Sequence, residues 1–197
     1  MPLRCAIFDL DQTVAATARL LFDSWNAAMH AIGRPPSTEA EIVALFGPPE
    51  WVALREVAGA RDYPRAIDAY LRHYHAQHGQ VRVFDGIPEL LSRLGERHVF
   101  RGMITGKGRA TAEVTLAGIG LRAHFDLVLT GDELTRPKPA PDGILQMLDD
   151  ARCPPGDAVM IGDMPADVLC ARAAGVRPVA ALWDCAWRDE VLALRPG

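Results

Sequence analysis

From residue 80 onward, short apolar segments alternate with segments of helical periodicity. The apolar runs predict strands at residues 99–105, 125–130, 158–162 and 177–182. The intervening patterns predict helices at residues 109–117, 142–151 and 166–174, and Pro88 marks the first turn of another. A first apolar segment, residues 3–8, stands near the N-terminus. Strands and helices of these lengths, in this alternation, predict a parallel sheet with helices on both faces.

Residues 16–79 have a different pattern, which is helical throughout. One helix is predicted to run through Leu20, Trp25 and Met29 and to end at Gly33. A short helix around residues 42–46 and two longer ones at 50–59 and 64–78 follow, and no strand is expected in this block. We therefore predict a doubly wound α/β core formed by residues 1–15 and 80–197. It is interrupted after its first strand by an inserted helical cap, residues 16–79.

Composition and charge narrow the class of protein. A chain of 197 residues can hold one sizeable core with an insertion. A net charge of -4 gives no reason to expect nucleic acid or an anionic membrane as a partner. No apolar run approaches the roughly 18 residues that span a bilayer, and no signal peptide is recognisable. We expect a cytoplasmic protein, and we expect its four widely spaced cysteines to be reduced.

Polar residues cluster where the predicted strands end. The residues in question are Asp9, Asp11, Thr105, Lys138, Asp163 and, four positions after Asp163, Asp167. In an open α/β sheet the carboxyl ends of the strands form one ligand-binding edge, so these side chains are expected to meet there. Four carboxylates against one lysine cannot all stay ionised without a cation. Carboxylate oxygens are typical Mg²⁺ ligands, so we predict a magnesium site.

The spacing of the first two aspartates suggests their roles. Asp9 and Asp11 are two positions apart on a strand, so both face the same pocket. Attack by Asp9 on phosphorus would give an aspartyl-phosphate, and Asp11 would protonate the leaving oxygen and later activate water. Thr105 and Lys138 would hold the phosphoryl oxygens.

These segments together resemble the four motifs of the haloacid dehalogenase (HAD) superfamily. The motifs are residues 9–13, Thr105, Lys138 in the segment 138–142, and the segment 162–167. Segments 84–88, 125–132 and 171–176 also resemble the subfamily that includes phosphoglycolate phosphatase and β-phosphoglucomutase. The resemblance implies a Rossmann-like core with a helical cap that closes over the substrate.

The resemblance also implies a role for each matching residue. Asp9, Asp163 and the backbone carbonyl of Asp11 would bind Mg²⁺, and Asp167 would act in the outer shell or through water. Thr105, Gly106 and Lys138 would bind the phosphate group. The implied activity is a phosphatase acting on a small phosphorylated metabolite, such as phosphoglycolate or a sugar phosphate, by a monomer or homodimer.

Three alternative functions remain open at this stage. A phosphosugar mutase would share the chemistry but require specific polar contacts from the cap. A phospho-receiver signalling domain is disfavoured, because its acidic pair precedes the phosphorylated aspartate and it lacks a large helical insertion. A catalytically inactive binding protein would not need the complete set of strand-end residues.

Gln12 and the pair Ala15-Ala16 depart from the family pattern. Gln12 stands where the family usually has glycine, at a sharp turn that glycine makes at least cost. We expect Gln12 to strain the turn or reshape the entrance without abolishing the chemistry.

Several other residues have both a structural and a functional interpretation. Asp132 is expected to cap the helix or turn that follows it, and Lys107 is considered as a phosphate ligand. Residues 47–49 are considered as a loop that reaches the active site. Three aromatic residues could line the substrate pocket: Trp25, Phe46 and Trp51. Three arginines could select an anionic substrate: Arg19, Arg34 and Arg55. Three histidines could form a metal site: His73, His75 and His78.

Overall fold

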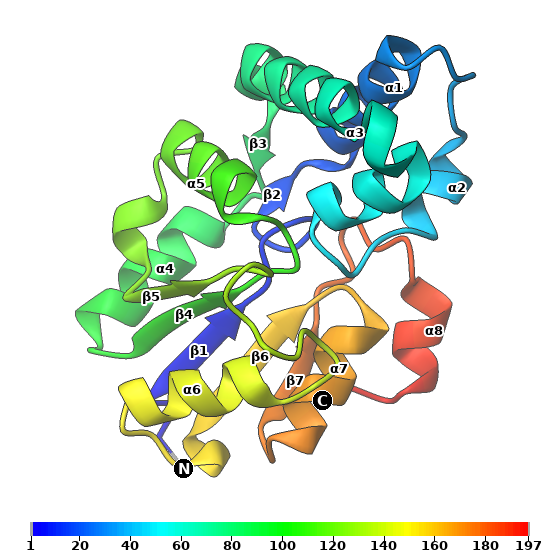
Figure 1. The fold of residues 1–197 in the computed structure, drawn as a ribbon. Helices are drawn as coiled ribbons and strands as arrows, with labels where there is room; N and C mark the ends of the chain where they lie inside the picture. The colour runs from blue at the N-terminus through cyan, green and yellow to red at the C-terminus, as the bar shows by residue number, and fades with distance from the viewer. Residues whose placement is uncertain (1, 197) are drawn as a thin grey trace.

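The computed structural model describes residues 2–196 and has a five-stranded parallel sheet at its centre (Figure 1). The strand order is β5-β4-β1-β6-β7, with β1 in the middle. The strands are β1 (Cys5–Phe8), β4 (Phe100–Ile104), β5 (Leu127–Leu129), β6 (Ala158–Gly162) and β7 (Arg177–Ala180). The chain winds from β1 in both directions, so the predicted doubly wound α/β fold is confirmed.

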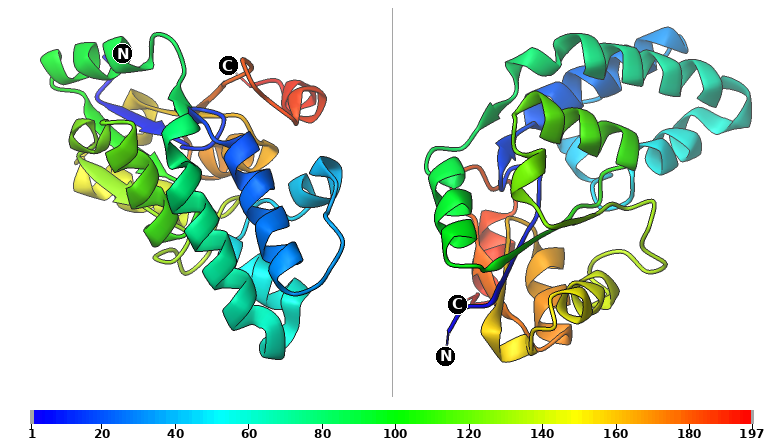
Figure 2. Two further views of the ribbon diagram at one scale, coloured as in Figure 1. Left: turned by 90° about the horizontal axis from the view of Figure 1, so that it is seen from above. Right: turned by 90° about the vertical axis from the view of Figure 1, so that its left-hand side faces the viewer.

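Helices cover both faces of the sheet (Figure 2). They are α4 (Ile87–Glu96), α5 (Arg109–Gly118), α6 (Asp142–Asp150) and α7 (Pro165–Ala173), with α8 (Arg188–Ala193) beside α7. Ala6 and Phe8 of β1 pack in one hydrophobic cluster with α4 and α5. Cys5 and Ile7 pack in the other cluster, with α6 and α7. The alternation of side chains along a buried strand thus supplies apolar surface to both layers.

The inserted helices form a third hydrophobic cluster of their own. They are α1 (Ala18–Ala31), α2 (Glu39–Val43) and α3 (Glu50–Gln77). The long helix α3 is interrupted at Gly59, whose φ of 73° is accessible to glycine without steric cost. The two helices expected on either side of residue 60 are therefore present as two segments of one element. Within residues 2–196, no helix is both long and apolar enough to cross a membrane.

A two-stranded antiparallel sheet joins the insertion to the core. It consists of β2 (Ala15–Ala16) and β3 (Arg82–Val83). The expectation of no strand within residues 16–79 is wrong at Ala16, because a two-residue strand has no periodicity to detect. The chain leaves the core through β2 and returns to it through β3, so the pairing of these strands holds the two connections to the insertion side by side. Three short 3₁₀ helices, His78–Gln80, Arg122–His124 and Pro155–Asp157, complete the elements.

Gln12 occupies the turn between β1 and β2 in a left-handed conformation, with φ at 58°. Its Oε1 accepts hydrogen bonds from the backbone N–H groups of Thr17, at 2.8 Å, and Ala18, at 2.9 Å. These N–H groups lie at the N-terminus of α1, where Thr17 provides no side-chain cap of its own. The side-chain Nε2 of Gln12 donates to Asp184, in the loop after β7, at 2.5 Å. Gln12 is thus a capping residue that also links the first turn of the insertion to the C-terminal loop.

Two substitutions of Gln12 separate the free-energy cost of its left-handed backbone from the stabilisation that its capping hydrogen bonds provide. Gln12→Ala keeps the left-handed strain and loses the cap, so the free energy of unfolding should fall by about 1 kcal/mol or somewhat more. Gln12→Gly also loses the cap but relieves roughly 1–2 kcal/mol of left-handed strain, so it should be nearly neutral. Urea unfolding of the two variants checks this order. An alanine variant as stable as the glycine variant would contradict it.

Candidate active site

A pocket of about 110 Å³ lies between the carboxyl edge of the sheet and the inserted helices. Asp9 and Asp11 follow β1, Thr105 follows β4 and Asp163 follows β6, while Lys138 comes from the long loop before α6. All five line this pocket, together with Gly106. The structure thus brings the residues singled out in the sequence into one place.

Lys138 lies at the centre of the carboxylates. Its Nζ donates to Asp9 Oδ1 at 2.8 Å and to Asp167 Oδ1 at 2.6 Å. The Lys138 side chain is 9% exposed, and the two carboxylates are less exposed still. Attraction to Asp167 and Asp9 outweighs burial and raises the pKa of Lys138, so this lysine stays charged. A lysine held so tightly can place a fixed positive charge beside a phosphoryl group.

Asp9, Asp163 and Asp167 form the group of carboxylates best suited to hold a metal. Each offers an oxygen within 4.8 Å of the others, and all three side chains are buried. Burial, followed by the nearby charges of Asp9 and Asp167, raises the pKa of Asp163 above its ordinary value. Burial also raises the pKa of Asp9, although Lys138 opposes it. A buried set of hard oxygen donors with too little positive charge fits a divalent cation such as Mg²⁺.

Two local features orient this group. Thr13 donates its hydroxyl to Asp163 Oδ1 at 3.0 Å, which holds that carboxylate toward the end of β1. Asp167 accepts from the backbone N–H of Met164 at 3.0 Å, at the start of α7. A Cβ atom at Gly162 would lie only 2.2 Å from Asp167 Oδ2, so only glycine leaves room for Asp167 here. The sequence motif from 162 to 167 therefore works as one packed unit.

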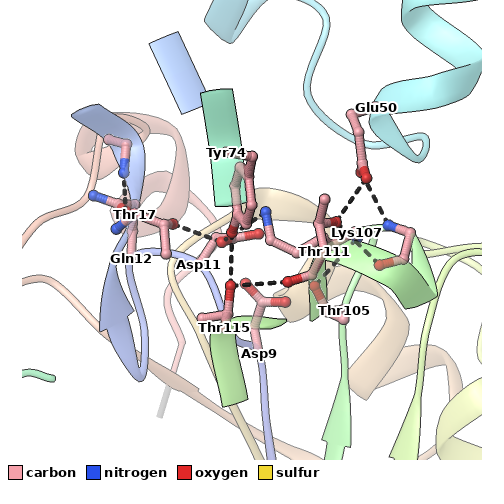
Figure 3. Close-up of polar contacts among 12 residues, drawn as sticks. Asp9, Asp11, Gln12, Thr17, Glu50, Tyr74, Thr105, Lys107, Thr111 and Thr115 are labelled. Carbon is pink, nitrogen blue, oxygen red and sulfur yellow. Dashed lines mark hydrogen bonds and ion pairs between the residues drawn. The ribbon is translucent and has the colours of Figure 1, made fainter. Parts of the chain in front are cut away.

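The carboxylate of Asp11 is not part of this group of three, although Asp11 also lines the pocket. It accepts a hydrogen bond from the Thr17 hydroxyl at 2.5 Å and pairs with Lys107 Nζ at 3.3 Å (Figure 3). Lys107, whose side chain is 2% exposed, also lies over the ring of Tyr74, 5.0 Å from its centroid. Lys107, considered from the sequence as a phosphate ligand, is thus engaged with Asp11 and Tyr74. Nothing local in the sequence indicates this pairing, which joins residues 96 positions apart.

The loop at residues 47–50 lies against the segment that follows β4. Glu50 accepts from the backbone N–H of Gly108 at 3.0 Å and from the Thr111 hydroxyl at 2.6 Å (Figure 3). A Cβ atom on Gly106 would lie 2.5 Å from the carbonyl oxygen of Gly47, so glycine permits this approach. Gly47 and Pro48 both line the pocket. The loop proposed from the sequence to reach the active site therefore does so.

The interpretation of Asp132 is wrong in one respect. Its carboxylate accepts from the backbone N–H of Arg109, at 2.5 Å, and from Trp51 Nε1, also at 2.5 Å. It therefore caps α5, which precedes it in the chain by 23 residues, and not the segment that follows. The parallel sheet places the loops after β4 and β5 side by side, which makes this long-range contact possible.

The remaining sequence candidates divide between pocket and surface. Trp25 and Phe46 line the pocket, whereas Trp51 does not. Arg19, Arg34 and Arg55 are exposed and absent from the pocket lining. His73 contacts Ser24, His78 is buried near Tyr74, and His75 is exposed. Among the residues that the structure describes, the three histidines form no metal-ligand group.

Comparison with known proteins assigns the family. Residues 6–181 match the sequence profile of haloacid dehalogenase-like hydrolases, which is most of the chain. This chain belongs to that family. The predicted family and its fold are thereby confirmed.

Individual HAD relatives cover nearly the whole chain. A phosphoglycolate phosphatase from Xanthomonas campestris pv. campestris is 30% identical over 98% of this chain and 93% of its own length. The pyrophosphatase PpaX from Bacillus velezensis is 27% identical over 96% of this chain and 88% of its own. A crystal structure of a predicted phosphoglycolate phosphatase from Haemophilus somnus superposes with a TM-score of 0.85 at 17% identity. It covers 98% of this chain and 92% of that one.

Proposed function

We propose that this HAD-family protein is a Mg²⁺-dependent phosphatase that hydrolyses a small phosphate ester through an aspartyl-phosphate on Asp9. The observation that carries the proposal is the buried carboxylate of Asp9, held by Lys138 at 2.8 Å and grouped with Asp163 and Asp167. A nucleophile, a fixed cation and a set of oxygen donors then meet at one pocket. The relatives named as phosphatases and pyrophosphatase support the same reaction class.

The residues of the chain perform two half-reactions. The free carboxylate oxygen of Asp9 attacks phosphorus, and the bond from phosphorus to the leaving oxygen breaks as Asp11 protonates that oxygen. Asp11 then takes a proton from water, which attacks the phosphorus of the aspartyl-phosphate. The bond from phosphorus to the Asp9 oxygen breaks, which releases inorganic phosphate and restores the Asp9 carboxylate. Thr105, Gly106 and Lys138 hold the phosphoryl oxygens. Mg²⁺ bound by Asp9, Asp163 and the Asp11 carbonyl, with Asp167 beside them, would supply additional positive charge at the phosphoryl group.

The inserted helices act in this proposal as a cap domain. Residues 16–79 would form the cap, and residues 1–15 with 80–197 the catalytic core. The separate hydrophobic cluster of α1, α2 and α3 supports this division. Contacts such as Glu50 with Gly108, and Tyr74 with Thr115 at 2.6 Å, would then hold the cap on the core.

Hydrolysis is better supported than a mutase reaction. A mutase must rebind its substrate in the reverse orientation, which requires polar groups in the cap. The inserted helices contribute six side chains to the pocket: Leu21, Trp25, Ile42, Glu50, Ala53 and Tyr70. Most of these are apolar, and the carboxylate of Glu50 is already hydrogen-bonded to Gly108 and Thr111. Membership of the HAD family also excludes the phospho-receiver interpretation.

Removing the metal should stop turnover. The crowded carboxylates need a divalent cation to bring a dianionic phosphate beside them. EDTA treatment should therefore abolish phosphate release, and added Mg²⁺ should restore it, whereas Na⁺ at equal ionic strength should not. Phosphate release measured against a generic ester such as p-nitrophenyl phosphate checks this. A fully chelated sample that keeps its rate would contradict the metal role.

Asp11→Asn should slow catalysis without removing the nucleophile. Asparagine cannot give or take the proton, so kcat should fall by roughly 10²–10⁴-fold. An ester with a good leaving group needs less protonation, so its first step should be less affected than that of an alkyl phosphate. Steady-state and burst kinetics with both esters provide the measurement. Equal loss of the burst-phase rate, which reports the first step, for the two esters would place the acid elsewhere.

A further inference from the structure

The wall of the pocket that faces the phosphate site is apolar. The side chains from the inserted helices and their loops that line it are Leu21, Trp25, Ile42, Leu45, Phe46, Pro48, Ala53 and Tyr70, with Glu50. Trp25 directs its ring N–H to Ser37 at 3.2 Å, so this donor is already used. The part of a substrate beyond its phosphate group therefore meets mainly hydrocarbon.

The positively charged side chains in the pocket lining already form ion pairs with carboxylates of the protein. Lys107 and Lys138 are the only Lys or Arg residues in the pocket lining, within the part of the chain that the structure describes. Lys138 bridges Asp9 and Asp167, and Lys107 pairs with Asp11 and is almost completely buried. The arginines of the inserted helices point to solvent or pair on the surface, as Arg19 does with Asp23. The described part of the chain therefore offers no further lysine or arginine in the lining to receive a second negative group on the substrate.

The charge that does face the pocket from the cap is negative. Glu50 is in the pocket lining, and its hydrogen bonds to Gly108 and Thr111 are to neutral donors. A carboxylate or second phosphate on the substrate would be desolvated against hydrocarbon and repelled by Glu50. The buried hydroxyl of Tyr70 lies in the same wall and offers one polar group.

From this lining we infer that the pocket selects phosphate monoesters whose leaving group is uncharged. This inference rests on the proposed phosphatase function. The apolar part of the leaving group lies against Leu21, Leu45 and Phe46. Substrates with a second anionic group, such as phosphoglycolate and pyrophosphate, are rejected. The substrate specificity then differs from the phosphoglycolate phosphatase and pyrophosphatase activities after which the relatives are named.

A matched pair of esters tests the inference with the wild-type protein and Mg²⁺. Hydroxyacetone phosphate and 2-phosphoglycolate differ mainly in a methyl group replacing a carboxylate oxygen. We expect kcat/KM to be at least about tenfold higher for the uncharged member, because an unpaired charge in an apolar site is costly. Pyrophosphate should be as poor as phosphoglycolate. Equal or higher kcat/KM for either anionic substrate would overturn the inference and leave the phosphatase function standing.

Variants of Leu45 test whether the apolar wall causes the preference for an uncharged leaving group. Leu45→Arg should place a cation in the wall and shift the kcat/KM ratio toward phosphoglycolate by about tenfold or more. Leu45→Met, which keeps an apolar side chain of similar volume, should leave the ratio within about twofold. An unchanged ratio in a folded arginine variant would overturn the role of the wall. If none of the esters, nor p-nitrophenyl phosphate, is hydrolysed by the wild type, the proposed function itself fails.

Discussion

Asp9→Asn should abolish phosphate release while the protein stays folded. The amide cannot attack phosphorus, so the covalent route is lost, and kcat should fall by at least about 10⁴-fold. The substitution also removes one negative charge from three crowded carboxylates, while Lys138 keeps its 2.6 Å contact with Asp167. The free energy of unfolding without metal should therefore stay close to that of the wild type.

A covalent test distinguishes Asp9 from its neighbours. Borohydride reduction during turnover should convert the aspartyl-phosphate at residue 9 to homoserine, which peptide mass spectrometry detects. Asp62→Asn, on α3 and outside the pocket lining, is the matched control, since among the described residues its carboxylate pairs with Arg65 alone. It should leave the rate unchanged. Substantial turnover by Asp9→Asn, or a label at another aspartate, would sink the nucleophile assignment.

Lys138→Met has the largest expected effect on stability. It leaves the buried carboxylates of Asp9, Asp163 and Asp167 without the one ammonium group that the described residues place beside them. Removing one partner of a buried ion pair costs about 3–5 kcal/mol, because the remaining charge is not compensated. Urea unfolding in EDTA should show this loss. Activity should fall as well, because the lysine holds the phosphoryl group in the proposed mechanism.

Magnesium should partly reverse the defect in stability. A cation that binds the folded state replaces some of the missing charge, so the difference from the wild type should shrink at saturating Mg²⁺. Arg136→Met is the control in the same loop. Its ion pair with Asp142 is exposed, so its loss should cost less than about 1 kcal/mol with or without metal. If Lys138→Met were as stable as this control, Lys138 would not compensate the negative charge of the buried carboxylates.

The sheet and its flanking helices could be predicted because their signals are local. A strand such as Ala158–Gly162 is an uninterrupted apolar run, and a helix such as α4 begins with proline in its first turn. The ribbon of Ala15–Ala16 with Arg82–Val83 could not be predicted in this way. Its residues pair across 66 and 68 positions and are too few to produce a pattern.

Gln12 shows the limit of comparison with a family pattern. From the sequence, it is a departure from glycine at a strained turn. In the structure its side chain caps α1 and reaches Asp184, a residue 172 positions away. The compensation for the strain therefore lies in contacts that neither residue indicates alone.

The sequence by itself determined the order of strands and helices, and with it the meeting of Asp9, Thr105, Lys138 and Asp163 at one edge of the sheet. This is because parallel strands bring their carboxyl ends together whatever the connections between them. Only the tertiary structure decided that Asp11 pairs with Lys107, that Asp132 caps α5, and that the pocket wall is apolar. These contacts join residues from separate elements, and their partners depend on how the inserted helices pack on the core.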